Sequence, residues 1–260
     1  MPMTDPKISI ITVVRNGAAT IEDTILSVAS QDYPRIEHIV IDGASTDGTL
    51  DIVHRHRDKI AAFKSEPDRG MYDAMNKGLA LATGEIIGFL NADDIHADSR
   101  VLREIADTLS APEVDACYSD LVYVSRTNTR KVVRYWKSRP YLDGLFEKGW
   151  MPAHPTFYAK RWVYEKYGGY DTAYRRQSDF ELTLRFLAVH KIKSAYIPRV
   201  LVRMRSGGAS RGLWHILEGN LEAYRACRKH SLNVTPLFIV KKILSRVPQF
   251  FHRDRFEASP

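Results

Sequence analysis

The chain has 260 residues, 44% of them hydrophobic, and a formal net charge of +7, so it is long enough to bury one large core or two modest ones. Its two cysteines, Cys117 and Cys227, are too few and too far apart for a disulfide framework, which points to a reducing compartment. No apolar run approaches the ~20 residues of a membrane span and the N-terminus lacks a signal-peptide profile, so we expect a cytoplasmic protein that is soluble or peripheral on the inner face of the membrane.

The positive charge is unevenly distributed along the chain. Residues 1–100 hold 10 Lys/Arg against 16 Asp/Glu, whereas residues 101–260 hold 28 against 15. An acidic first half suits a metal site. A basic second half suits polyanions, so phosphorylated ligands, anionic lipid headgroups and nucleic acid are all candidate partners at this point.

The first hundred residues alternate between two hydrophobic periods. Short apolar runs predict strands at residues 7–14, 37–42, 60–65 and 86–90. Thr20 with Asp23 three residues later is a capping-box pattern and predicts a helix start, and a further helix is expected over about 72–82. Because strand–helix alternation builds right-handed crossover units, we predict an α/β fold with a Rossmann-like, mostly parallel sheet flanked by helices.

The last of these strands leads into Asn91-Ala92-Asp93-Asp94. Two adjacent carboxylates at the carboxyl end of a buried strand lie where open α/β sheets bind their ligands. Burying such a pair is costly unless a cation or a proton compensates, and Mg²⁺ or Mn²⁺ held by a few carboxylates and substrate phosphates is one answer. The alternative is a polar strand-to-helix turn in which an Asp caps the helix.

After about residue 110 the alternation loosens. Strands are expected at 116–125 and 131–136, and residues 135–170 are rich in aromatic side chains that suit either a core or sugar stacking. Ser178 and Glu181 form a second capping-box pattern before an amphipathic run at 182–190. A helix is expected over about 212–230, within a helical, basic C-terminal extension.

Other predicted strand ends carry acidic residues too: Asp42 ends the second strand, and Glu66 and Asp68 follow the third. In a parallel sheet these ends share one edge, so we expect the carboxylates to converge on one cleft. Asp42 occupies the place where nucleotide-binding α/β folds often hold a base or ribose hydroxyl. The sequence has no Gly-x-Gly-x-x-Gly after the first strand and no Gly-Lys-Ser/Thr loop, which argues against a dinucleotide cofactor and a P-loop NTPase.

Seven motifs, in order, together resemble the family 2 glycosyltransferases of the GT-A fold, which transfer sugars from nucleotide-sugar donors with inversion. The matching pieces are residues 14–16, 41–49, 68–78, 84–94, 154–157, 168–171 and 178–182. The resemblance covers roughly residues 7–210. It implies a GT-A domain over 1–210, with a nucleotide-sugar-binding half at 1–110 and an acceptor-binding half at 111–210, followed by the extension at 211–260.

The resemblance also implies roles for individual residues. The implied donor contacts are Asn16, Asp42, Asp68, Asn76, Asn91 and Asp93. Asn91-Ala92-Asp93 occupies the family's Asp-x-Asp motif, so Asp93 and Asp94 compete for the role of ligand to Mg²⁺ or Mn²⁺. Asn91 departs from that motif and supplies no charge.

Asp179 resembles the family's catalytic base. A carboxylate must take the acceptor hydroxyl's proton during in-line displacement, and a position in the first turn of a helix keeps an Asp ionised. The family often has Glu before this Asp, where this chain has Ser178, which we expect to cap the helix. The alternative is that Asp179 only stabilises the helix start.

Four further residues are candidates on the acceptor and phosphate sides. His154, before Pro155, and Trp150 are candidate acceptor contacts. Arg205 and Arg211 flank the Gly207-Gly208 loop where some relatives close over the pyrophosphate. The alternative for each is an ordinary structural or solvated role.

The leading hypothesis is an inverting glycosyltransferase that moves a sugar, with a UDP-sugar as the expected donor, to a saccharide or lipid-linked acceptor in surface polysaccharide or glycolipid synthesis. The alternatives are a nucleotidyltransferase on a similar sheet and a basic nucleic-acid-binding protein; the acidic cleft argues against nucleic acid as a partner. In a helix over 236–251, one stripe would hold Leu237, Val240, Leu244, Val247 and Phe251. That stripe either packs on the domain or contacts an anionic membrane surface.

Overall fold

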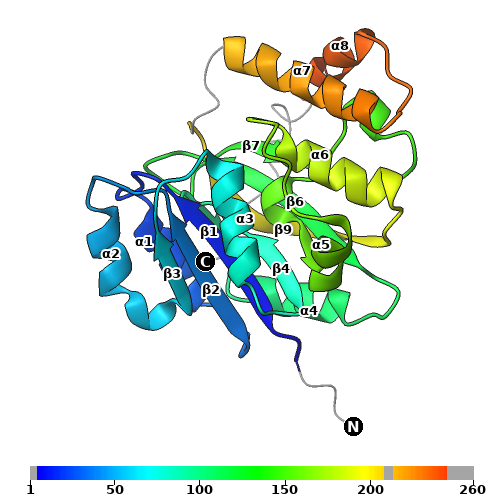
Figure 1. Ribbon diagram of the computed structural model, residues 1–260. Coiled ribbons are helices and arrows are strands. Elements are labelled where there is room, and N and C mark those ends of the chain that lie inside the picture. Colours follow the sequence, from blue (N-terminus) through cyan, green and yellow to red (C-terminus); the bar gives the residue numbers. More distant parts are fainter. Residues whose placement is uncertain (1–4, 208–212, 245–260) are drawn as a thin grey trace.

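The structure is a computed structural model, and it describes residues 5–207 and 213–244 (Figure 1). Nine strands in this part of the chain form one sheet: β1 (Ile8–Val14), β2 (Ile36–Asp42), β3 (Ala62–Ser65), β4 (Ile86–Phe89), β5 (Asp94–His96), β6 (Ala116–Val124), β7 (Val132–Trp136), β8 (Tyr158–Lys160) and β9 (Ser194–Arg205). The helices are α1 (Ile21–Ala29), α2 (Thr49–Arg55), α3 (Met71–Leu81), α4 (Val101–Leu109), α5 (Arg161–Tyr167), α6 (Ser178–Leu184), α7 (Leu213–Lys229) and α8 (Leu237–Leu244).

The sheet has a parallel half and a mixed half. Its order is β3-β2-β1-β4-β8-β6-β9-β5, with β7 paired to β6. Strands β3, β2, β1 and β4 are all parallel, as the strand–helix alternation predicts, and β6 pairs with β9 in parallel as well. Strand β8 enters antiparallel between β4 and β6, which joins the two halves into one layer.

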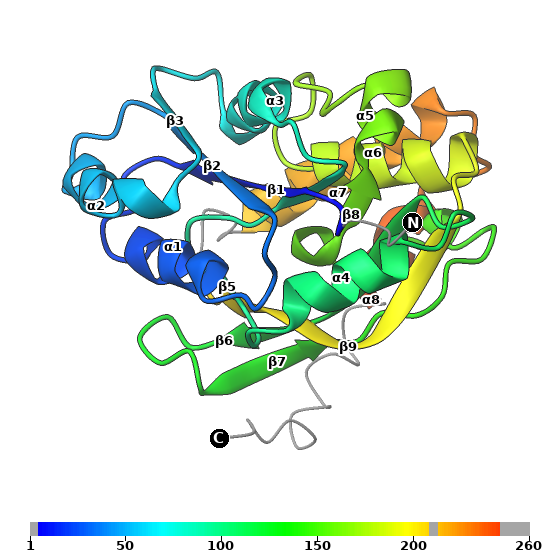
Figure 2. The same cartoon turned by 90° about the horizontal axis from the view of Figure 1, so that it is seen from below.

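Helices cover both faces of this sheet (Figures 1 and 2). On one face α3, α5 and α6 pack against side chains such as Ile11 and Ile39, and on the other face α1, α2 and α4 pack against Ile10 and Val40. The alternation along β1 and β2 explains this division, because successive strand residues point to opposite faces. The predicted α/β architecture is therefore confirmed.

The last two helices share the main core. Ala223, Ala226 and Cys227 of α7 and Phe238 of α8 are buried in the same cluster as α3, α5 and α6. Figure 1 shows both helices lying over the α6 side of the sheet. No helix in the described part of the chain is long and apolar enough to cross a membrane.

Both predicted capping boxes are wrong. Thr20 directly precedes α1, but its hydroxyl does not cap the helix, and Asp23 pairs with Arg205 instead. Ser178 is the first residue of α6, and its buried hydroxyl has no hydrogen-bond partner among the described residues. At the start of α6, Glu222 of α7 bonds the backbone amides of residues 175–177 instead.

Candidate active site

The carboxyl ends of β1, β2 and β4 meet at one edge of the sheet, where most of the predicted site residues lie. Asp42, the last residue of β2, is fully buried. Its carboxylate accepts hydrogen bonds from the Ser45 amide at 3.0 Å, the Ser45 hydroxyl at 2.5 Å and the Ser65 hydroxyl at 2.6 Å. Asp42 thus holds the loop after β2 against β3, and its predicted contact with the donor remains untested.

Asn16 connects the loops that follow β1 and β2. Its backbone adopts a positive φ of 53°, its amide N–H donates to the Ser45 hydroxyl at 2.7 Å, and its side-chain oxygen accepts from the Thr46 amide at 2.9 Å. The side chain is exposed, so it lies at the rim of the edge formed by the two loops.

Asp68 lies directly over the backbone of Gly43. A Cβ on Gly43 would stand 2.2 Å from the Asp68 carboxylate oxygen Oδ2, so only glycine leaves room for that carboxylate. The other oxygen of Asp68 accepts from the Gly70 amide at 2.8 Å, at the start of α3. No local sequence pattern predicts this dependence of Asp68 on Gly43, because the two residues come from different loops.

Asn91, Asp93 and Asp94 form a short turn between β4 and β5. The Asn91 amide donates to Asp94 Oδ2 at 3.2 Å, while Asp94 Oδ1 and Asn91 Oδ1 are buried without a partner among the described residues. Burial raises the pKa of Asp93, and burial together with the Asp93 charge raises the pKa of Asp94 well above its usual value. Neighbouring groups of the protein therefore do not fully compensate the acidic side chains of this turn.

This arrangement fits a hard divalent cation. Mg²⁺ and Mn²⁺ prefer oxygen ligands, and the unpartnered oxygens of Asn91 and Asp94 are of that kind. No three His, Cys, Asp or Glu side chains in the described ranges stand close enough to form a metal site by themselves. A cation here would take one or two carboxylates and complete its coordination with substrate phosphates and water.

Arg205 is hydrogen-bonded to the acidic turn at Asn91–Asp94. It is 6% exposed, its Nη1 donates to the Asp93 carbonyl at 3.0 Å, and its Nη2 pairs with Asp23. Its guanidinium thus links the turn to α1, and the phosphate contact expected for Arg205 stays a prediction. Arg211 lies outside the described residues.

Asp179 lies in the first turn of α6, with two polar side chains against its carboxylate. His154 Nδ1 is 3.2 Å from Asp179 Oδ2, and the Tyr72 hydroxyl donates to Oδ1 at 3.2 Å. Burial lowers the pKa of His154, while the charges of Asp179 and Asp93 raise it. The imidazole thus contacts α6 directly through Asp179, and burial favours its neutral form.

A second layer holds Tyr72 in place. Its ring stacks on Tyr170 with the ring centroids 5.4 Å apart. Asn76 of α3 donates to the Tyr170 carbonyl at 2.8 Å and accepts from the Tyr170 amide at 2.9 Å. Asn76 thus uses both ends of its amide to fix Tyr170, and its contact with the donor stays a prediction.

Trp150 belongs to an aromatic cluster beside α6. Its ring lies 5.6–5.9 Å, centroid to centroid, from the rings of Tyr118, Tyr141 and Phe146. The indole Nε1 is buried and has no hydrogen-bond partner among the described residues. Packing explains the ring, and an acceptor contact for Trp150 stays a prediction.

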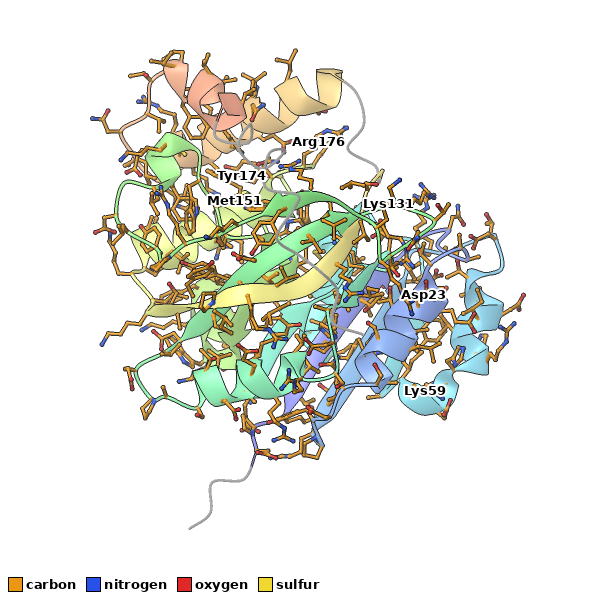
Figure 3. The ribbon with its side chains drawn as sticks, turned by 180° about the vertical axis from the view of Figure 1, so that it is seen from behind. Asp23, Lys59, Lys131, Met151, Tyr174 and Arg176 are labelled. Carbon is orange, nitrogen blue, oxygen red and sulfur yellow. The ribbon has the colours of Figure 1, made fainter. Side chains whose placement is uncertain are left out.

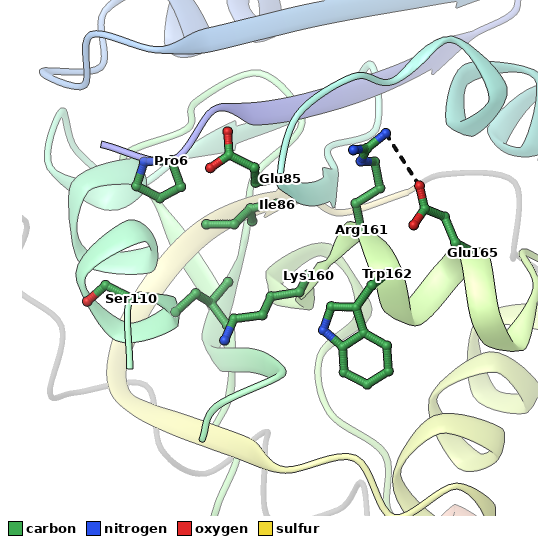
Figure 4. A pocket seen from close by; sticks show the side chains of 9 residues that line it. Pro6, Glu85, Ile86, Ser110, Lys160, Arg161, Trp162 and Glu165 are labelled. Carbon is green, nitrogen blue, oxygen red and sulfur yellow. Dashed lines mark ion pairs between the residues drawn. The ribbon is translucent and has the colours of Figure 1, made fainter. Parts of the chain in front are cut away.

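One surface pocket lies away from all these residues (Figure 4). It is lined by Ile86, the first residue of β4, and by Lys160, Arg161 and Trp162, so it opens at the other end of that strand. Arg161 and Glu165, one turn apart on α5, form an ion pair at 3.4 Å on one side of it. The predicted site residues do not reach this pocket.

Comparisons with known proteins agree with this geometry. The family described as "Glycosyl transferase family 2" matches residues 9–177. A "PGL/p-HBAD biosynthesis glycosyltransferase" from Mycobacterium tuberculosis is 30% identical over 210 residues, which cover 79% of this chain and 79% of the relative.

Two solved structures share the fold. TarS from S. aureus, in complex with UDP-GlcNAc, superposes with a TM-score of 0.66 at 17% identity and covers 94% of this chain and 72% of its own. The mannosyltransferase PcManGT from Pyrobaculum calidifontis, in complex with GDP-Man and Mn²⁺, gives a TM-score of 0.64 at 24% identity, covering 94% and 70%. The expected GT-A fold is confirmed by this likeness.

Proposed function

The chain belongs to glycosyl transferase family 2, and on that premise we propose that it moves a sugar with inversion from a nucleotide-sugar donor to a hydroxyl of a saccharide or lipid-linked acceptor. The family membership leaves the nucleotidyltransferase and nucleic-acid-binding alternatives without support. The observation that carries the proposal is the contact between His154 Nδ1 and Asp179 Oδ2, at 3.2 Å.

We assign the donor to the edge formed by Asn16, Asp68 and the turn at Asn91–Asp94. The partly buried Asp68 and the exposed Asn16 line the loops where a nucleoside would lie. The unpartnered oxygens of Asn91 and Asp94 would hold a divalent cation against the donor diphosphate. That cation, when bound, would neutralise charge on the departing nucleoside diphosphate.

Asp179 is then the base. As the acceptor oxygen bonds to the anomeric carbon, the bond from that carbon to the diphosphate oxygen breaks, and the hydroxyl proton passes to the Asp179 carboxylate. Attack from the face opposite the leaving group inverts the anomeric centre. His154 and Tyr72 each contact one oxygen of Asp179 and so fix its orientation.

We also propose that the acceptor is lipid-linked. The mycobacterial relative is named for PGL/p-HBAD biosynthesis. On α8, Leu237, Val240 and Ile243 are 55%, 48% and 43% exposed, whereas Phe238 and Lys242 face the core. We propose that this outward apolar face contacts an anionic membrane surface, with the basic C-terminal segment of the sequence adding charge attraction. Val247 and Phe251 of the predicted stripe lie outside the described residues.

A thermal-shift panel tests the proposed function. The chain is heated with UDP-glucose, UDP-GlcNAc, GDP-mannose and dTDP-rhamnose, each with Mn²⁺ and with EDTA. We expect one nucleotide sugar to raise the melting temperature in Mn²⁺ and much less in EDTA, because a ligand stabilises the fold it binds. Nucleoside diphosphate release with that donor then reports turnover. No shift with any nucleotide sugar or free nucleoside diphosphate would contradict the proposal.

A further inference from the structure

The segment just before α6 is held by a carboxylate from the C-terminal part of the chain. Glu222 of α7 accepts a hydrogen bond from the Arg175 amide at 3.0 Å on Oε1. It accepts from the Arg176 amide at 2.8 Å and the Gln177 amide at 3.0 Å on Oε2. Glu222 is 7% exposed, so these bonds are shielded from water.

Three consecutive amides on one carboxylate fix the path of the chain into α6. The first amides of a helix and those just before it lack intrahelical partners, and Gln177, the residue before α6, gives no side-chain cap. A buried carboxylate is strongly favoured next to such amides because they satisfy its oxygens and carry the positive end of the helix dipole. Glu222, which lies 45 residues after Gln177 in sequence, therefore anchors the start of α6. The Ser178 hydroxyl does not provide such an anchor.

The neighbouring contacts reinforce the same segment. Arg176, labelled in Figure 3 beside the C-terminal helices, pairs with Glu218 of α7 at 2.7 Å. Lys242 of α8 donates to the Gln177 side-chain oxygen at 2.6 Å and lies 4.2 Å from the centroid of the Phe180 ring. Gln177 and Phe180 lie on either side of Asp179 in sequence, so α7 and α8 both act on the turn that carries it.

We propose that Glu222 is a positioning residue for the transfer reaction: it holds residues 175–177 so that Asp179 meets His154 and the acceptor hydroxyl. The proposal rests on the assignment of Asp179 as the base. A shift of about 1 Å in a reacting group can cost 10²-fold in rate. Loss of the Glu222 anchor should therefore lower turnover without weakening donor binding, because the donor is assigned to the loops after β1, β2 and β4.

The test compares E222A and E222Q with the matched control R225Q, at an exposed position of the same helix. Turnover is nucleoside diphosphate release from UDP-glucose, UDP-GlcNAc or GDP-mannose, whichever gives the largest thermal shift, with Mn²⁺ and water as the acceptor. We expect E222A to lower kcat by roughly 10- to 100-fold with the donor KM within about twofold of the parent. E222Q keeps the acceptor for Arg176 and Gln177 and should fall in between, and R225Q should match the parent.

A double variant separates this idea from the base assignment. If Glu222 acts through Asp179, E222A should cause no further loss in a D179N background, because coupled residues are not additive. Two results would overturn the role of Glu222 alone. One is a loss of turnover in D179N with normal turnover in E222A. The other is that E222A lowers turnover in the D179N background by the same factor as in the parent. Normal turnover of D179N would overturn the base assignment and the role of Glu222 with it. Should E222A not fold, E222Q is judged by the same criteria.

Discussion

His154 Nδ1 lies 3.2 Å from Oδ2 of Asp179, although the two residues are separated by the whole of β8 and α5. The imidazole therefore touches the carboxylate that we assign as the base. Because burial favours the neutral ring, its Nδ1–H can donate to Asp179 without neutralising it as an ion pair would. His154, a predicted acceptor contact, is therefore also placed to orient the proposed base.

Replacing Asp179 by Asn should lower kcat by about 10²–10⁴, the scale of losing general-base help, with little change in donor binding. His154→Ala should cost on the order of tenfold, since it orients the base but does not take the proton. Both are measured by nucleoside diphosphate release and donor titration. Near-normal turnover of the Asp179 variant would mean that this residue only stabilises the start of α6.

Asp93→Asn and Asp94→Asn should each weaken metal-dependent donor binding while the fold stays intact. The physical reason is the loss of a charged oxygen ligand from a turn whose other oxygens are already unpartnered. The measurement is the donor-induced rise in melting temperature with Mn²⁺ and with EDTA. Full activity in excess EDTA, with no metal retained by the protein, would contradict the role of this turn.

Gly43→Ala should weaken donor binding on the order of tenfold, the scale of a misplaced hydrogen bond to a charged group. The new methyl would stand 2.2 Å from Asp68 Oδ2 and force that carboxylate away. Gly48→Ala is the matched control, because its Cβ would lie at an ordinary 3.7 Å from Ala18. Calorimetric donor titration distinguishes the two; equal affinities would show that Asp68 does not contact the donor.

The free energy of unfolding should decrease as the pH falls from about 6.5 toward 5. Burial lowers the pKa of His38 to about 3 and that of His96 to about 4, while an unfolded chain regains the ordinary value of 6.5. Below that pH the unfolded state binds protons that the folded state does not bind. Each ring therefore lowers the free energy of unfolding by up to about 1.4 kcal/mol per pH unit.

Urea unfolding at a series of pH values checks this expectation. His96→Gln should flatten the slope, whereas the exposed His54→Gln should leave it unchanged. A slope in the parent protein that is flat between pH 7 and 5 would show that neither buried imidazole controls stability there.

Serine at Leu237, Val240 and Ile243 together should reduce co-sedimentation with vesicles that contain phosphatidylglycerol. These side chains point outward, so the substitutions spare the core, which a truncation that removed Phe238 and Lys242 would damage. Leu142→Ser is the control, since Leu142 is 66% exposed elsewhere on the surface. If the parent and the triple variant bind these vesicles equally, α8 is not the membrane contact.

The fold class and the position of the acidic residues at the carboxyl ends of strands are both readable from local sequence patterns. Alternating apolar positions fix the faces of β1 and β2, and short apolar runs fix the parallel strands, because these are local periodicities. The turn at Asn91–Asp94 follows β4 as expected, and the motif order led to the family that the comparisons confirm.

The hydrogen-bond partners of the polar side chains, in contrast, depend on how distant segments pack together. Asn76 fixes Tyr170, Arg205 holds the Asp93 turn, and Glu222 anchors the start of α6. Each partner is distant in sequence. A buried polar side chain forms a hydrogen bond with whichever unpaired polar group the fold brings within about 3 Å. Local patterns predicted caps from Thr20 and Ser178, but no local pattern encodes such distant pairings; they arise from the packing of helices on the sheet.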